Sequence, residues 1–182
     1  MVLPRYLPEE PFPPYSFVPG RFPHPISDPL GHSHGPRPEV PEIPDPERWH
    51  DCRPWLRGVD LFNHGFYWEA HEVWEGLWQA CGRTGMLADF FKALIHTAAA
   101  GVKVRQKLPA GMHSHLKRAL ELFHATREGL SDGQTHLMGL DVNATIRHLD
   151  SWQHPHQGEI TLELGTRPLF PDSLMLRKNS PE

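Results

Sequence analysis

The stretch that decides the fold is DLFNHGFYWEAHEVWEGLW, residues 60–78, which combines three tryptophans, two histidines and three glutamates. Apolar side chains recur in it with the period of an α-helix. The residues on this apolar face are Phe62, Phe66, Ala70, Val73 and Leu77. The pattern predicts one core helix from Asp60 to Trp78, with Asp60 as its N-cap.

The opposite side of this predicted helix carries reactive side chains. They are His64, Trp68, His71, Glu72 and Glu75, with Glu69 at the edge. His71 and Glu75 are four residues apart and therefore neighbours on a helix surface. Imidazole and carboxylate groups on one and a half turns suit either a metal site or a general acid–base site. His71, Glu72 and Glu75 are the candidate catalytic residues, and His71 and Glu75 are candidate metal ligands.

Several enzyme classes are excluded or disfavoured by their motifs. His71 and Glu72 begin like the zincin motif HExxH, but the fourth position after His71 is Glu75 rather than histidine. Two ExxH pairs, Glu47 with His50 and Glu121 with His124, are too few and too easily produced by chance to indicate a di-iron bundle. The chain has no GxSxG, phosphate loop or GxGxxG. We therefore expect neither an activated serine nor nucleotide-dependent chemistry.

The first fifty residues form a proline-rich arm. Fourteen of the 20 prolines lie between Pro4 and Pro46, which favours extended segments and turns over helix or central strand. The arm also carries aromatic side chains, which disordered tails generally lack. They are Tyr6, Phe12, Tyr15, Phe17, Phe22 and Trp49. We expect the arm to wrap over the helical body of its own chain or of a neighbouring one.

Four possible metal ligands cluster within the arm segment RFPHPISDPLGHSHG. They are His24, Asp28, His32 and His34. Imidazole and carboxylate groups bind zinc and other transition metals. The alternative is a rigid turn in which the histidines only donate and accept hydrogen bonds.

Further helices follow the central stretch. Apolar periodicity predicts helices over Met86–Gln106, Met112–Glu128 and Val142–Trp152, the last capped by Asp141. A short helix in the PERWHDCRPWL region, residues 46–56, would be limited by Pro54. The expected fold is all-α, a compact bundle of four to five helices. Residues 1–50 would be the wrapping arm, 51–152 the helical domain, and 153–182 an extended tail in which ITLEL alternates like a strand.

Composition limits the partners and the compartment. A chain of 182 residues is long enough for one domain with a sizeable core. Its net charge of −4 and lack of a long basic run disfavour nucleic acid and anionic membranes. With no apolar signal region and no long apolar run, we expect a soluble, cytoplasmic protein. Cys52 and Cys81 belong to no CxxC pattern and are expected to be free thiols.

The central stretch closely resembles the bacterial and archaeal domain of unknown function family numbered 309. The matching residues are Asn63, Gly65, Tyr67, Glu69, His71, Glu72, Glu75 and Trp78, followed by an alanine-rich helix and by MGLD at 138–141. The resemblance covers roughly Leu56 to Leu149 and implies a small all-helical fold without an established activity. The family usually has Gln-Gly where this chain has Lys92 and Ala93, so contacts made there are expected to differ.

Three functional hypotheses remain open at this point. In the first, the His/Glu cluster is either a buried structural network of hydrogen bonds or a small-molecule or metal-binding pocket. The pocket residues would be Asn63, Trp68, Glu69, Lys92 and His96, and the metal would be a divalent transition metal such as zinc.

The second hypothesis is a hydrolase, and whether the protein is an enzyme stays open. His71 and Glu75 would be ligands or base, Glu72 would transfer protons, and Lys92 or His96 would stabilise negative charge. The third hypothesis is a homo-oligomer clasped by the arm.

Overall fold

The computed structural model describes residues 3–35, 39–153 and 174–177. Within these ranges the α-helices are α1 (Arg53–Asn63), α2 (Tyr67–Ala80), α3 (Met86–Arg105), α4 (Pro109–Glu128) and α5 (Val142–Gln153). A 3₁₀ turn, η1 (Trp49–Asp51), precedes α1, and a small antiparallel hairpin of β1 (His136–Leu137) and β2 (Leu140–Asp141) precedes α5. The predicted all-α bundle is confirmed.

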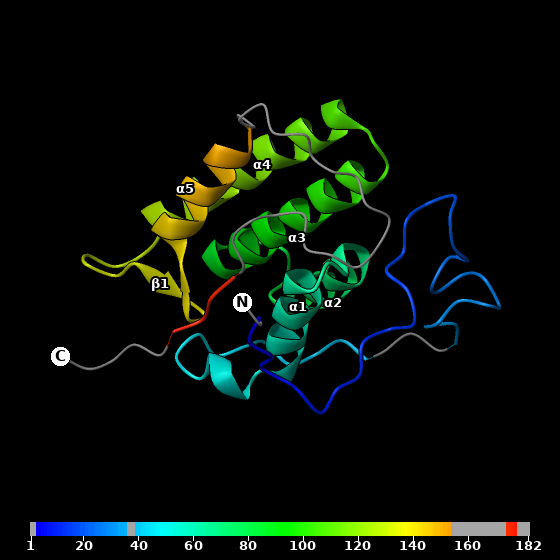
Figure 1. The fold of residues 1–182 in the computed structure, drawn as a ribbon. Helices are drawn as coiled ribbons and strands as arrows, with labels where there is room; N and C mark the ends of the chain where they lie inside the picture. Colours follow the sequence, from blue (N-terminus) through cyan, green and yellow to red (C-terminus); the bar gives the residue numbers. More distant parts are fainter. Residues whose placement is uncertain (1–2, 36–38, 154–173, 178–182) are drawn as a thin grey trace.

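The helices pack in the order in which they follow along the chain. Helix α1 lies on α2, α2 on α3, α3 on α4, and α4 on α5 (Figure 1). Short connections make neighbouring helices antiparallel. Helix α3 is therefore the central element, which explains why buried residues extend around much of this helix.

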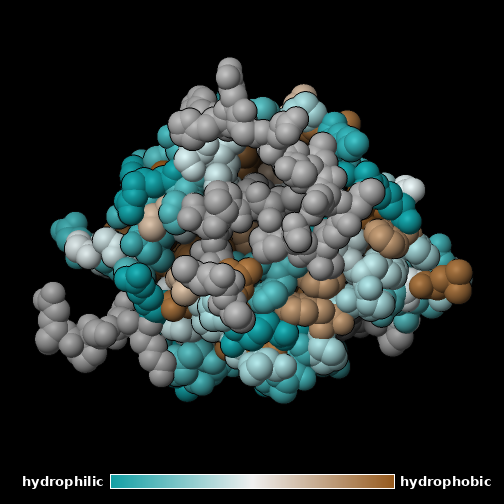
Figure 2. Space-filling model, viewed as in Figure 1, coloured by the Kyte–Doolittle hydropathy of each residue, from teal (hydrophilic) through white to brown (hydrophobic). Residues whose placement is uncertain are grey.

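Aromatic rings fill the core between α1, α2 and α3. Trp55, Trp74 and Phe90 are fully buried. The Trp55 ring lies 6.1 Å from that of Trp74 and 5.6 Å from that of Phe90, between centroids. The Trp55 indole donates a 3.0 Å hydrogen bond to the Met138 carbonyl, which joins α1 to the β-hairpin. Among the coloured atoms of Figure 2, hydrophilic residues predominate over apolar ones. No helix in the described ranges combines the length and apolar character needed to cross a membrane.

The single helix predicted from Asp60 to Trp78 is wrong, because the chain turns at His64–Phe66. Gly65 has φ of 82°, a conformation that glycine adopts without strain. The Phe66 amide donates to the Leu61 carbonyl and the Gly65 amide to the Phe62 carbonyl. These two bonds form a Schellman motif that ends α1. The apolar periodicity continues across the break, which is why the pattern predicts one helix.

Asp60 is not an N-cap, because it lies within α1 and is fully buried. Its carboxylate accepts hydrogen bonds from the Tyr6 amide at 2.8 Å, the Leu7 amide at 2.9 Å and the Arg5 guanidinium at 3.1 Å. The N-terminal arm therefore lies on its own chain, as Figure 1 shows for the blue segment beside α1.

Asn63, one turn further along α1, holds the C-terminal segment. Its side chain donates to the Leu174 carbonyl at 2.9 Å and accepts from the Leu174 amide at 2.7 Å. The Leu176 amide donates to the Tyr6 hydroxyl at 2.8 Å, so the two terminal segments also contact each other. The ITLEL stretch lies outside the described residues. The boundaries at residues 50 and 152, a clasped second subunit and a cytoplasmic location stay predictions.

Two prolines lie at the starts of helices, although Pro54 was expected to limit one. Pro54 lies in the first turn of α1 and Pro109 is the first residue of α4. Proline is tolerated there because the first amides of a helix have no acceptor within it. The predicted cap of α5 is confirmed, since the Asp141 carboxylate accepts a 2.9 Å hydrogen bond from the Ala144 amide.

The Asp60 contact predicts a large loss of stability on truncation. Asp60→Ala leaves the Arg5 Nε and the amides of Tyr6 and Leu7 without their acceptor, so we expect a loss of about 3–5 kcal/mol. Urea unfolding measures this loss, and limited proteolysis should cut the arm sooner. Asp132→Ala, at an exposed position, is the matched control, and equal effects of the two substitutions would contradict the assigned role.

Two helical glycines should respond oppositely to alanine. A Cβ at Gly101 would lie 2.6 Å from the Tyr67 ring, whereas one at Gly76 would lie 3.5 Å from Pro41, at ordinary contact distance. Gly101→Ala should destabilise by about 1–3 kcal/mol through overpacking. Gly76→Ala should stabilise by about 0.5–1 kcal/mol, because alanine loses less entropy in a helix. Chemical denaturation of both variants tests this, and the same sign in both would refute it.

Candidate functional site

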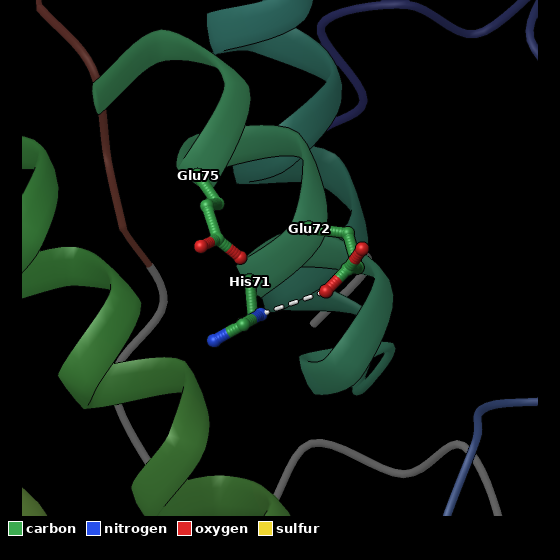
Figure 3. A group of neighbouring side chains, drawn as sticks. All are labelled: His71, Glu72 and Glu75. Atoms are coloured by element: carbon green, nitrogen blue, oxygen red, sulfur yellow. Dashed lines mark ion pairs between the residues drawn. The ribbon is translucent and has the colours of Figure 1, made fainter. Parts of the chain in front are cut away.

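Helix α2 presents a compact group of possible metal ligands. His71, Glu72 and Glu75 each offer one ligand atom, and these atoms all lie within 4.8 Å of one another. Figure 3 shows Glu75 and Glu72 on either side of His71. Glu75 is four residues after His71 and three after Glu72, so its side chain neighbours both on the surface of one helix. The described residues contain no second group of this kind.

The His71 ring is only loosely held by its neighbours. Its Nδ1 lies 3.3 Å from a Glu72 oxygen, close enough for an ion pair when the ring is protonated (Figure 3). The geometry is not that of a hydrogen bond, so Nδ1 is buried without a hydrogen-bond partner among the described residues. The His71 and Glu72 side chains are 27% and 33% exposed, which leaves the group accessible from solvent.

Two further histidines meet between α3 and α4. The Nδ1 atoms of His96 and His115 are 3.0 Å apart, so one ring donates to the other and at least one of them is neutral. Burial, followed by the charges of His115 and Lys92, lowers the pKa of His96 to about 4. Burial also lowers the pKa of His115.

The His96–His115 pair belongs to the same region as the α2 group. A positive charge on His71 contributes to the lowered pKa of both His96 and His115. Three helices therefore bring imidazoles within electrostatic reach of one another. At neutral pH the pair is uncharged, and neutral imidazole is the form that accepts protons or binds metals.

Lys92 points to a different neighbour. Its Nζ lies 4.0 Å from the centre of the Trp78 ring, a cation–π contact between α3 and the end of α2. Its charge still contributes to the lowered pKa of His96. Lys92 therefore lies near His96, and among the described residues it makes no bond to Glu72 or Glu75.

The remaining residues predicted to line the pocket contact the terminal segments. Asn63 binds Leu174, as described above. The Trp68 ring makes edge contacts with Phe17 and with His24, each at 5.2 Å between centroids. This tryptophan lies under the arm, where it helps to pack it against α2.

Glu69 holds the middle of the arm. Its Oε1 accepts a 2.8 Å hydrogen bond from the Phe17 amide and lies 3.1 Å from His32 Nε2. The side chains of Glu69 and His32 are each only 6% exposed. Burial raises the pKa of Glu69, and the bond from the Phe17 amide partly offsets this increase. Asn63 and Glu69 are thus buried polar groups whose hydrogen bonds fix the packing, which is the structural alternative to a ligand pocket.

The four arm residues do not form a three-ligand group in the described structure. His24 Nδ1 accepts from the Ile26 and Ser27 amides at 3.3 and 3.2 Å. The Asp28 carboxylate accepts from the Leu30 amide at 2.9 Å, and His34 Nδ1 lies 3.0 Å from the Ile26 carbonyl. These local bonds, together with the contact between His32 and Glu69, fit the alternative of a turn in which the histidines make hydrogen bonds.

His115 is absent from the residues singled out in the sequence. Its position lies three residues after Met112 and four before Ala119, both buried in α4. A histidine at this spacing lies beside the core stripe of its helix. That spacing from two buried residues was the available signal.

The model of a family described as Domain of unknown function (DUF309) matches residues 55–114. The resemblance expected from the sequence is therefore confirmed over these residues. The DUF309 match includes nearly all of α1, all of α2 and α3, and the start of α4. It contains His71, Glu72, Glu75 and His96, and it ends one residue before His115. No curated protein and no solved structure matches the chain.

The low pKa of His96 predicts loss of stability in acid. As the pH falls from about 6.5 to about 4, the unfolded chain binds a proton that the folded chain does not. This costs about 1–2 kcal/mol once solvent screening at a half-buried site is allowed for. His96→Gln should flatten the curve of unfolding free energy against pH in this window. His113→Gln, exposed on α4, is the control. An unchanged slope in His96→Gln would contradict the assignment.

Proposed function

We propose that the protein binds a divalent transition metal ion, with zinc as the first choice, through His71, Glu72 and Glu75. The observation that supports this is the convergence of three donor atoms within 4.8 Å on one helix. One imidazole nitrogen and two carboxylate oxygens are donors that zinc accepts. The buried His71 Nδ1, which has no hydrogen-bond partner among the described residues, is a donor atom available for coordination.

Partial exposure of the group favours a site with an open coordination position. Structural zinc sites use four protein ligands, whereas catalytic sites use three and leave one position for water or substrate. Here three donors come from α2, and both His71 and Glu72 are partly accessible. A ligand on the metal would be accessible from solvent.

The second candidate function is metal-assisted hydrolysis, favoured by the neutral His96–His115 pair. A bound divalent metal supplies Lewis acidity that makes a coordinated water more acidic. In this alternative His71 and Glu75 would hold the metal, and Glu72, with an oxygen 3.3 Å from His71 Nδ1, would accept the proton instead of binding the metal. The His96–His115 pair, uncharged at neutral pH, is a second acceptor on α3 and α4.

Metal content and affinity test the proposed site. The purified protein, stripped with chelator and titrated with zinc in a calorimeter, should bind one equivalent. His71→Ala and Glu75→Gln should each weaken binding by about 10–100-fold or more, because the first removes a donor and the second replaces a carboxylate with a neutral amide. His113→Ala and Glu128→Gln, exposed on α4, are matched controls for residue type. His34→Ala in the arm should leave binding unchanged.

Two outcomes would overturn the metal site. One is the absence of zinc binding by a folded wild-type protein. The other is equal affinity in wild type and in folded His71→Ala. Circular dichroism of each variant shows whether it has kept its helices, so that a loss of binding is separated from a loss of folding.

A further inference from the structure

The chain's two cysteines lie at one end of the α1–α2 pair. Cys52 directly precedes α1 and Cys81 directly follows α2. The two helices pack together and are joined by the short turn His64–Phe66. Because the pair is antiparallel, the start of α1 and the end of α2 lie at the same open end of the hairpin.

The register of the two helices brings the cysteines to the same level. Near the turn, the rings of Phe62 and Tyr67 are 5.2 Å apart. Further from the turn, Gly58 lies directly against Trp74, whose indole leaves no room for a Cβ. Cys52 is six residues before Gly58, and Cys81 is seven residues after Trp74. Equal rise along both helices therefore places the two cysteines at about the same level of the pair.

The surroundings of the thiols agree with this placement. Both are partly buried and pack against the hydrophobic core, and both are free thiols in this structure. Burial raises the pKa of each thiol, and a charge on Cys52 further raises the pKa of Cys81. At Cys52 the Trp55 amide partly opposes the effect of burial on the pKa. The two sulfurs are thus electrostatic neighbours.

We propose that Cys52 and Cys81 form a reversible disulfide bond that closes the open end of the α1–α2 hairpin. The oxidant is a small-molecule disulfide such as oxidised glutathione. One protein thiolate attacks this disulfide, forming a mixed disulfide and releasing one reduced glutathione. The second protein thiolate then attacks the mixed disulfide at the protein sulfur and releases the second glutathione. The protein loses two protons and two electrons, and one oxidised glutathione becomes two reduced molecules.

The bond would act on the element that holds both terminal segments. Helix α1 carries Asp60 and Asn63, which bind the arm and the segment at Leu174. A covalent link from the start of α1 to the end of α2 fixes α1 against the core. It also restricts the unfolded chain between the two cysteines. The raised thiol pKa values make the reaction slow at neutral pH and faster as the pH rises, because the thiolate is the attacking species.

The experiment is redox equilibration of the full chain under native conditions. The protein is incubated in mixtures of reduced and oxidised glutathione, quenched, alkylated in denaturant and weighed by intact mass spectrometry. We expect an oxidised monomer that has lost two hydrogen atoms and takes up no alkylating agent, reversed by dithiothreitol. The Tm of this species should rise by roughly 5–10 °C. Cys52→Ser and Cys81→Ser are matched controls, and neither should form an internal bond.

Several results would overturn the disulfide. Two alkylatable thiols throughout, glutathione adducts on both cysteines, or disulfide-linked dimers would each show that the thiols do not meet. Oxidation only after the helical circular dichroism signal is lost would show that the folded geometry forbids the bond. A lower Tm on oxidation would have the same meaning. None of these results bears on zinc binding, because the proposed donors include no cysteine.

Discussion

The buried carboxylate of Asp60 is the interaction on which the arrangement of the non-helical chain depends. A carboxylate without partners in the core would cost several kcal/mol. Here it accepts from two arm amides and from Arg5. The start of the arm has to cross α1 at this point for the carboxylate to be satisfied. With that crossing in place, Tyr6 is positioned to bond the amide of Leu176, so one buried charge organises both terminal segments.

The same principle recurs twice in the residues that follow. Asn63 pairs with the backbone of Leu174, and Glu69 accepts from the backbone of Phe17. In each case a buried polar side chain bonds a backbone group of an extended segment, which has no partner for that group in a helix or sheet. The arm carries many prolines and makes few backbone bonds of its own. It is therefore held by side chains of the helices and by aromatic packing around Trp68.

This division separates two kinds of polar residue within one stretch. Asp60, Asn63 and Glu69 are buried and bonded to the chain outside the bundle. His71 and Glu72 are partly exposed, and the His71 Nδ1 has no hydrogen-bond partner among the described residues. The first group accounts for packing, so the second is where the proposed function lies. The turn at Gly65 separates Asp60 and Asn63, which hold the two terminal segments, from the ligand group on α2, where Glu69 also holds the arm.

The sequence by itself determined the features that depend only on residues close together along the chain. Helical periodicity is local, so the all-α class, the extents of α3 and α5, and the Asp141 cap follow from it. The grouping of His71, Glu72 and Glu75 is also local, because helix geometry alone brings them together.

Only the tertiary structure decided the role of Asp60, the meeting of Glu69 with Phe17, and the pairing of His96 with His115. From the local sequence alone, a carboxylate near an expected helix start is interpreted as an N-cap. Its actual partners lie more than fifty residues away. Their position depends on how the arm crosses the folded helices, and no short stretch of sequence encodes that crossing.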